Sequence, residues 1–171
     1  MTLHDRLRAA FADCDPLQYG ASRYPVWAPG LPQSLCGHAT HLDCSSLTAY
    51  MLLHAYRNRL DDPHQLYREL QIFEGQPDWS PIGGVVREHI GRRVPVPVPG
   101  RWCLLQRWRF GSGGKRLSGH AMLVRQETDG LWVWHSTPRL VRGKTGPVLE
   151  RFKSYTDLLG GRDGRLAVLE E

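Results

Sequence analysis

The residues best suited to chemistry begin with a cysteine that stands directly before a helical pattern. Cys44 follows Asp43, and apolar residues recur at helical spacing from Leu47 onward. Asp43 and Ser45 are residue types that favour helix starts, so we expect Cys44 to lie at a helix N-terminus. Free N–H groups and the helix dipole stabilise a thiolate there, and a base within reach would make Cys44 a nucleophile.

Two histidines in the second half of the chain could supply that base and a group to orient it. His120 opens one predicted strand and His135 lies on the next, with a hairpin turn expected at Asp129-Gly130. A two-residue turn there would set residue 124 opposite residue 135 and place both imidazoles on one face of the sheet. The sequence therefore predicts a nucleophile, a base and an orienting residue, in the manner of cysteine hydrolases.

Asp43-Cys44-Ser45, followed by Gly119-His120 and by a polar residue on the next strand, resembles the NlpC-type cell-wall cysteine peptidases of the papain-like group. The resemblance covers residues 20–137. It implies an α+β fold with a papain-like core, in which N-terminal helices pack on a small antiparallel β-sheet. It also implies Cys44 as nucleophile, His120 as base, His135 as orienter, and an amide bond in peptidoglycan peptides as the substrate.

The resemblance extends to candidates for the oxyanion hole and for substrate binding. The family commonly has a tyrosine upstream of the nucleophile, and the segment from Arg23 to Trp27 is similar to that stretch. Tyr24, Trp27 and Ser45 are therefore further candidates beside the backbone N–H of Cys44. The family's Asp-Cys-Ser-Gly is Asp-Cys-Ser-Ser here, a small departure inside the predicted helix.

Three alternatives stay open from the sequence. The same fold could serve a cytoplasmic papain-like protease, deamidase or acyltransferase, because groove shape selects the acyl acceptor. A zinc site could form from the right ligand types, although their spacing differs from the common finger pattern: Cys36, His38, His41 and Cys44. A non-catalytic module could use the cations and tryptophans of residues 101–109 to bind nucleic acid or a partner protein, although no recognised nucleic-acid motif is present.

Length and composition indicate one ordinary globular domain, and the predicted thiol chemistry needs no cofactor or metal. The 171 residues carry a net charge of +5, spread along the chain, which favours a solvated basic surface over a nucleic-acid site. No apolar run approaches the roughly 18 residues of a membrane span, and the N-terminus has no signal-peptide pattern. We therefore expect a protein that is cytoplasmic until a specialised secretion system exports it or lysis releases it. An antibacterial effector or phage lytic protein fits, and an effector would have an immunity protein as partner.

The elements that must position these residues form one predicted hydrolase domain over residues 1–171. Its parts are an N-terminal helix and arm (1–41), a helical part with the nucleophile (42–93) and an antiparallel sheet with the histidines (94–171). Helices are predicted at 3–13, from 44 to about 59, at 64–73 and at 84–90, with a helical turn at 155–159. Strands are predicted at 101–110, 119–125, 131–135, 148–152 and 166–169, with a loop over 138–147. Helices followed by an antiparallel sheet predict an α+β fold.

Overall fold

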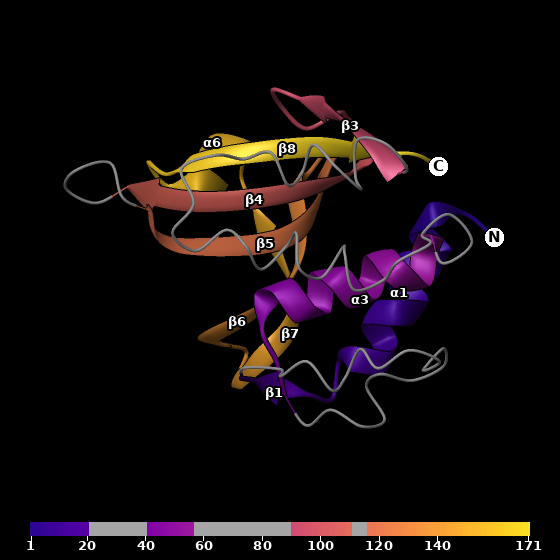
Figure 1. The fold of residues 1–171 in the computed structure, drawn as a ribbon, viewed down its shortest axis with the longest axis vertical. Coiled ribbons are helices and arrows are strands. Elements are labelled where there is room, and N and C mark those ends of the chain that lie inside the picture. The colour runs from indigo at the N-terminus through magenta and orange to yellow at the C-terminus, as the bar shows by residue number, and fades with distance from the viewer. Residues whose placement is uncertain (21–40, 57–89, 111–115) are drawn as a thin grey trace.

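The computed structural model describes residues 1–20, 41–56, 90–110 and 116–171. These form an α+β structure in which helices pack on both faces of a six-stranded antiparallel sheet (Figure 1). The order of helices followed by strands predicted this class correctly. The predicted helix 64–73 and all but the last residue of the predicted helix 84–90 lie outside the described residues. Within the described ranges, no helix has the length and apolar character to cross a bilayer.

The helices are α1 (Leu3–Cys14), α3 (Cys44–Tyr56) and α6 (Tyr155–Leu159). The main sheet runs in the order β3 (Gly91–Val94), β8 (Asp163–Leu169), β4 (Trp102–Phe110), β5 (Arg116–Glu127), β6 (Gly130–Val141) and β7 (Lys144–Phe152). A separate parallel pair joins β1 (Gln18–Tyr19) to β2 (His41–Leu42). The predicted strands are all present, and most are longer than the apolar pattern alone indicated.

Helix α1 begins at a capping box, as its sequence favours. Thr2 accepts a hydrogen bond from the backbone N–H of Asp5, and the Asp5 carboxylate accepts one from the backbone N–H of Thr2. The helix buries Leu3 and Leu7 against α3 and ends at Cys14, which is disulfide-bonded. The helix predicted over residues 3–13 is confirmed.

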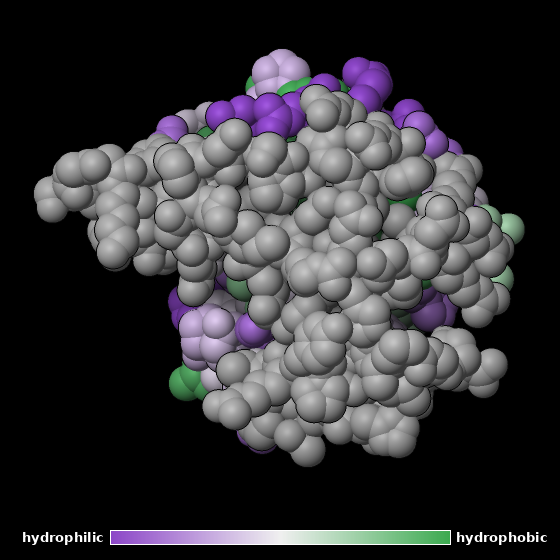
Figure 2. All heavy atoms as spheres, viewed as in Figure 1, coloured by the Kyte–Doolittle hydropathy of each residue, from purple (hydrophilic) through white to green (hydrophobic). Residues whose placement is uncertain are grey.

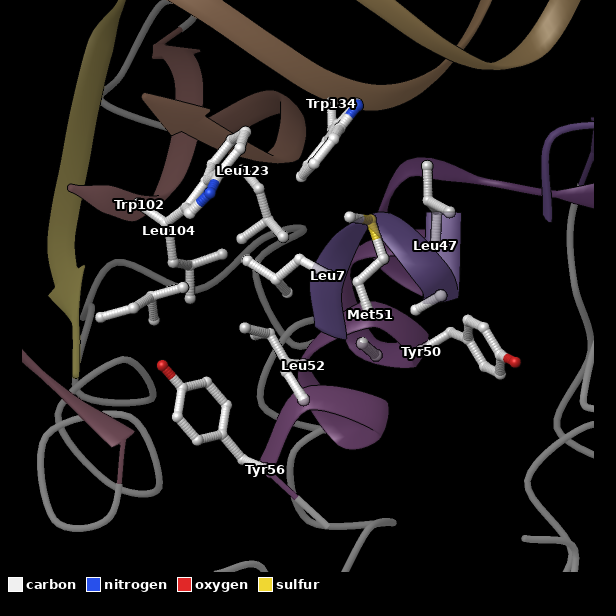
Figure 3. Close-up of a cluster of buried hydrophobic side chains, with 14 of the residues drawn as sticks. Leu7, Leu47, Tyr50, Met51, Leu52, Tyr56, Trp102, Leu104, Leu123 and Trp134 are labelled. Atoms are coloured by element: carbon white, nitrogen blue, oxygen red, sulfur yellow. The ribbon is translucent and has the colours of Figure 1, made fainter. Parts of the chain in front are cut away.

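The sheet carries a hydrophobic cluster on each face. On the face covered by α1 and α3, Leu47 and Met51 of α3 pack with Leu123 of β5, as Figure 3 shows. The rings of Trp102 and Trp134 stack beside them with centroids 4.3 Å apart. The opposite face holds a second cluster with α6: Cys103, Leu105, Met122, Val124, Leu131, Val133, Leu158, Leu166 and Val168. Alternate residues of β5 therefore serve different faces.

The β5–β6 hairpin has a different register from the predicted one. Glu127 pairs with Gly130, so Thr128 and Asp129 form the two-residue turn and Val124 lies opposite Val133. The predicted pairing of residue 124 with residue 135 is wrong by two positions. A shift of two residues preserves the face of every side chain, so the prediction that the two histidines share a face still holds.

The predicted loop over residues 138–147 is wrong, because this segment is a second hairpin between β6 and β7. Val141 pairs with Lys144 across Arg142 and Gly143, whose φ angles are 51° and 78°. Positive φ at both central positions is the geometry of a tight hairpin turn. Pro138 is tolerated because β6 has no β5 neighbour at that point and the β6–β7 register shifts there.

The sheet edge formed by β3 is protected by charge. Arg92 and Arg93 are exposed there, and Figure 2 shows hydrophilic side chains gathered along the top of the molecule, over the edge where β3 and β8 lie. Charged side chains on an edge strand discourage pairing with another chain. A proline-rich segment follows this edge strand directly.

We predict that Gly146→Ala destabilises the fold strongly. Gly146 has a φ of 98°, and a Cβ there would lie 2.6 Å from the backbone oxygen of Leu17. Alanine at this position would strain its own backbone and would clash with the backbone of Leu17, which cannot shift as a flexible side chain could. The free energy of unfolding should therefore fall by about 2–3 kcal/mol. Gly143→Ala is the control: its φ is 78° but nothing lies within 4 Å, so it should cost only about 1 kcal/mol. Urea unfolding of both variants measures the difference; equal costs would contradict the close approach.

Candidate active site

Helix α3 begins at Cys44 because Asp43 caps it. The Oδ1 atom of Asp43 accepts a hydrogen bond of 2.8 Å from the backbone N–H of Ser46, and its backbone oxygen accepts one from Leu47. These are the bonds of an N-cap residue, which makes Cys44 the first residue of the helix. The helix start predicted from Asp43-Cys44 is confirmed.

The Cys44 thiol is buried against strand β5. Its side chain is 9% exposed, and its sulfur makes a hydrogen bond with the backbone of Ala121. Burial raises the pKa of this thiol above its ordinary value, and the hydrogen bond with Ala121 offsets only part of that rise. Desolvation therefore opposes the stabilisation of a thiolate that is expected at the helix start. Cys44 needs a base to become a nucleophile.

The histidine predicted as that base stands next to Ala121 in the chain, and its side chain leaves β5 on the other face. Leu123 packs with α3, whereas Met122 belongs to the cluster on the α6 face. By alternation Ala121 faces α3, and His120 lies on the face of Met122. The structure thus brings Cys44 to the strand of His120 while the two side chains approach it from different faces.

The sheet is open at this point. The ladder between β5 and β6 starts at Leu123 and Trp134, so the stretch of β5 that carries His120 and Ala121 has no paired β6 backbone beside it. A cavity of about 560 Å³ is lined there by residues of both strands, among them Gly119, His120 and His135. We call this opening between β5 and β6 the seam. Its lining residues Met122 and Leu158 belong to the cluster on the α6 face, and Cys44 is not among the residues that line it.

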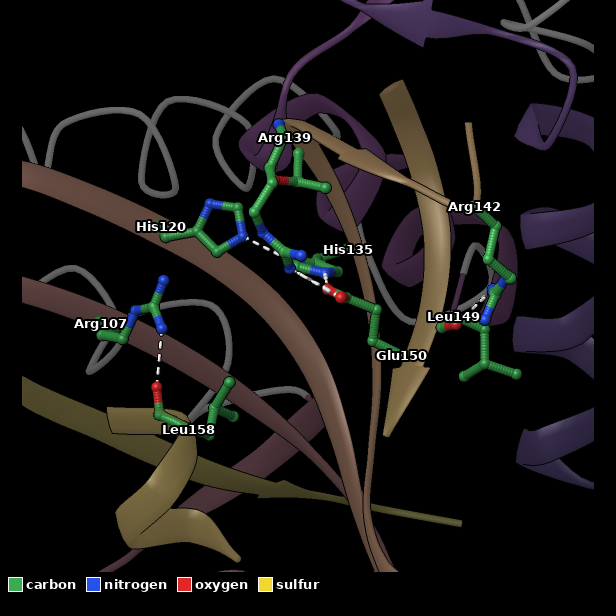
Figure 4. Close-up of polar contacts among 9 residues, drawn as sticks. Arg107, His120, His135, Arg139, Arg142, Leu149, Glu150 and Leu158 are labelled. Atoms are coloured by element: carbon green, nitrogen blue, oxygen red, sulfur yellow. Dashed lines mark hydrogen bonds and ion pairs between the residues drawn. The ribbon is translucent and has the colours of Figure 1, made fainter. Parts of the chain in front are cut away.

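Across the seam, the two predicted histidines form part of a hydrogen-bonded chain (Figure 4). Nε2 of His120 lies 2.7 Å from Nδ1 of His135, and Nε2 of His135 lies 2.6 Å from Oε2 of Glu150. Arg139 completes the chain with bonds of 2.7 and 2.8 Å to the two oxygens of Glu150. Both bonds come from the single Nη2 atom of Arg139, and as charge-assisted bonds they help to hold the carboxylate in place.

This chain fixes one proton on the His135 ring and relates it to the tautomer of His120. An ionised Glu150 only accepts hydrogen bonds, so Nε2 of His135 carries a proton. When Nε2 holds the only proton of His135, Nδ1 of His135 accepts a hydrogen bond from Nε2 of His120, and Nδ1 of His120 then has a free lone pair. Within the described residues, nothing else hydrogen-bonds the His120 ring. The nitrogen left free is the one that could accept a proton from a thiol.

The pKa values of the chain support these protonation states. The hydrogen bond from His135, aided by Arg139, lowers the pKa of Glu150 to about 2 against the opposing effect of burial. Burial lowers the pKa of His120 well below its ordinary value, and the neighbouring His135, Arg107 and Arg162 lower it further. Glu150 is therefore ionised and His120 neutral at neutral pH, the state in which an imidazole can act as a base.

We predict that acid weakens the fold through Glu150. A carboxyl whose folded pKa is about 2 and whose ordinary value is 4.5 stabilises the protein above about pH 4.5 and loses this contribution as the pH falls toward 2. Urea unfolding should show Glu150→Gln less stable than the wild type at pH 7, with the gap closing between pH 4.5 and pH 3. A gap that stays constant over this range would contradict the ionised carboxylate in the chain.

Ser136 links the seam to the approach of the nucleophile. Its hydroxyl donates a hydrogen bond of 2.6 Å to the backbone oxygen of Leu42, two residues before Cys44. His135, the preceding residue of β6, belongs to the imidazole chain on the opposite face. Ser136 thus fixes the backbone segment before the nucleophile, and the adjacent residue His135 fixes the orientation of the candidate base.

The remaining predicted candidates are only partly placed by the structure. Ser45 lies beside the nucleophile, with its Oγ 3.9 Å from the sulfur of Cys44, while Tyr24 and Trp27 lie outside the described residues.

The alternative interpretations gain no support from the described part of the chain. Of the alternative zinc ligands, Cys36 and His38 also lie outside it, and the described residues contain no group of three or more potential ligands placed to hold a metal ion. Trp102 and Trp108 are buried, so they cannot stack on nucleic-acid bases as the module alternative requires.

Glu150 and Arg139 are site residues that the sequence analysis missed. Val148, Glu150 and Phe152 alternate along β7 toward one face, and the first and last of them are apolar. A carboxylate between two inward apolar positions of a predicted strand is the signal that could have found Glu150. No family model, no curated protein and no solved structure matches this chain, so the candidate site rests on the chain's own geometry.

Proposed function

We propose that this protein is a cysteine hydrolase with a papain-like core, which cleaves amide bonds in peptidoglycan peptides. Cys44 is the nucleophile, His120 the base, and His135 with Glu150 orients the base. The observation that carries the proposal is the hydrogen-bonded chain from Glu150 through His135 to His120, which ends beside the residue that holds the Cys44 sulfur. A buried thiol at a helix start and an oriented neutral imidazole are the two parts that thiol-based acyl transfer needs.

The proposed reaction begins with proton transfer across the seam. Nδ1 of His120 takes the proton of the Cys44 thiol as the sulfur attacks the amide carbonyl carbon. The oxyanion forms near the start of α3, where the backbone N–H of Cys44 has no partner within the helix. His120 returns its proton to the amide nitrogen as the C–N bond breaks and the amine leaves. Water, deprotonated by His120, then hydrolyses the thioester and restores the thiol.

The substrate part of the proposal comes from the resemblance of Asp43-Cys44-Ser45 and Gly119-His120 to cell-wall peptidases. A protease, deamidase or acyltransferase would use the same thiol chemistry and differ in the groove and in the acyl acceptor. An enzyme that cuts peptidoglycan must reach the cell wall, so the proposal includes delivery by a specialised secretion system or by lysis. An effector delivered in this way would require an immunity protein in the cell that produces it.

Digestion of purified peptidoglycan tests this function. The wild-type protein and Cys44→Ala are incubated with the polymer, and the released fragments are identified by mass. Cleavage by the wild type alone, with one water added per broken amide bond, supports the proposal and identifies the bond. Equal fragment patterns from both proteins would exclude it. Cys44-dependent cleavage or deamidation of a protein, with peptidoglycan left intact, would favour the alternative substrates on the same fold.

A further inference from the structure

The cavity at the seam has a strongly cationic lining. Four guanidinium groups line it, from Arg107, Arg139, Arg151 and Arg162, together with the two histidines of the chain. Glu150 is the single carboxylate among the described residues that line it. Such a concentration of positive charge in one concave site raises the local concentration of anions and steers them to it.

Two of the four arginines are already paired with carboxylates. Arg139 binds Glu150 through both carboxylate oxygens, and Arg151 lies 2.6 Å from Asp129 while its guanidinium covers the ring of Trp132. These pairs neutralise the charge and hold the side chains in place. Each of these arginines therefore already has an anionic partner.

Arg107 and Arg162 have no carboxylate partner among the described residues. Arg107 is half-buried and donates one hydrogen bond of 2.7 Å to the backbone oxygen of Leu158, as Figure 4 shows. Burial lowers the pKa of Arg107, and the charge of Arg162 nearby lowers it further. Both cations also act on His120. The half-buried Arg107 and the exposed Arg162 thus line the same cavity as the candidate base.

We propose that the cavity binds an anionic oxygen group of the substrate, a carboxylate or a phosphate, through Arg107 and Arg162. The inference deepens the proposed function, since it names the chemical class of substrate for the same site. The planar guanidinium fork matches the oxygens of either anion, and an anion between the two groups would relieve their repulsion. The amide bond to be cleaved then belongs to an acidic molecule, whose charged group fixes its position relative to His120.

Anion binding has a consequence for the base itself. The cations around the cavity oppose protonation of His120, and a bound anion offsets them. The pKa of His120 should therefore rise toward its ordinary value when the site is filled. A base with a pKa nearer the working pH is more effective, so an acidic substrate would activate the base that deprotonates Cys44.

The test measures binding in the Cys44→Ala background, in which catalysis is absent. Inorganic phosphate and succinate are titrated at constant ionic strength, with succinamide as the uncharged control, and the ring signals of His120 are followed by NMR. We expect saturable binding of at least one anion, no binding of succinamide, and a rise in the pKa of His120. A tighter fit for phosphate would identify a phosphorylated substrate, and a tighter fit for succinate an acidic peptide.

Arginine variants distinguish a specific anion-binding site from non-specific electrostatic attraction of anions to the cavity. Arg107→Gln and Arg162→Gln should each weaken anion binding at least about tenfold, the loss of one charge-assisted contact. Arg151→Gln is the matched control, an arginine in the same cavity whose partner is Asp129, and it should change the affinity less than about threefold. Equal effects of all three variants, or no saturable binding of either anion, would overturn the anion site. Neither result would affect the Cys44-dependent digestion that tests the hydrolase function.

Discussion

Replacement of Cys44 by alanine should abolish amide cleavage, with kcat/KM lowered about 10⁴-fold or more. Loss of the nucleophile removes the covalent route entirely, and only binding and the oxyanion donors remain to accelerate the reaction. The fold should persist, because Asp43 still caps α3 and an alanine fills most of the volume of the buried thiol. Steady-state cleavage of a purified peptidoglycan fragment measures the effect, and circular dichroism confirms the fold.

Cys103→Ala is the control for this experiment. Cys103 is also a free and buried thiol, and burial likewise raises its pKa, but it lies in the apolar cluster on the α6 face. Its replacement should leave kcat/KM within about twofold while lowering stability by about 1 kcal/mol through the small cavity it creates. A Cys44→Ala protein that keeps more than a tenth of the wild-type rate would show that this sulfur is not the nucleophile.

His120→Ala should lower kcat/KM about a thousandfold. The buried thiol of Cys44 has a raised pKa, so the variant would have to ionise it without a base, and general-base catalysis typically contributes 10²–10⁴-fold. Alkylation of Cys44 by iodoacetamide at pH 7 should slow in parallel, since the thiolate is the reacting species. Added imidazole should restore part of the activity by entering the space left at the seam.

His54→Gln serves as the matched histidine control. His54 lies on the last turn of α3, about 15 Å along the helix from Cys44 at 1.5 Å per residue, and is not among the residues that line the cavity. Its replacement should change neither the cleavage rate nor the alkylation rate by more than about twofold. The assignment of His120 as the base would fail if His120→Ala and His54→Gln reacted with iodoacetamide equally fast.

The sequence predicted the parts of this fold that depend on local chemistry. Asp43 placed the start of α3 correctly, because capping depends only on neighbouring residues. The shared face of His120 and His135 was also predicted correctly although the turn was placed one residue too late. Face depends only on whether positions differ by an even number, whereas register depends on the actual turn residues.

What the sequence missed depends on contacts between distant segments. Glu150 belongs to β7, which pairs with β6 only through a hairpin turn at Arg142 and Gly143 that the sequence analysis took for a loop. Without that turn, no local pattern connects Glu150 with His135. The burial of Cys44 depends on how α3 packs against β5, and this packing decides whether the resting group is a thiol or a thiolate.

The hydrogen bond between Ser136 and Leu42 makes the position of β6 important for both halves of the candidate site. Because His135 and Ser136 are consecutive, any sliding or rotation of this strand displaces the imidazole chain and the segment before the nucleophile at the same time. An inserted residue between the two would reverse one of their directions and separate the two halves of the machinery. The two residues must therefore stay adjacent. Other sequences that form the same site should keep this histidine and serine consecutive even where the surrounding loops differ in length.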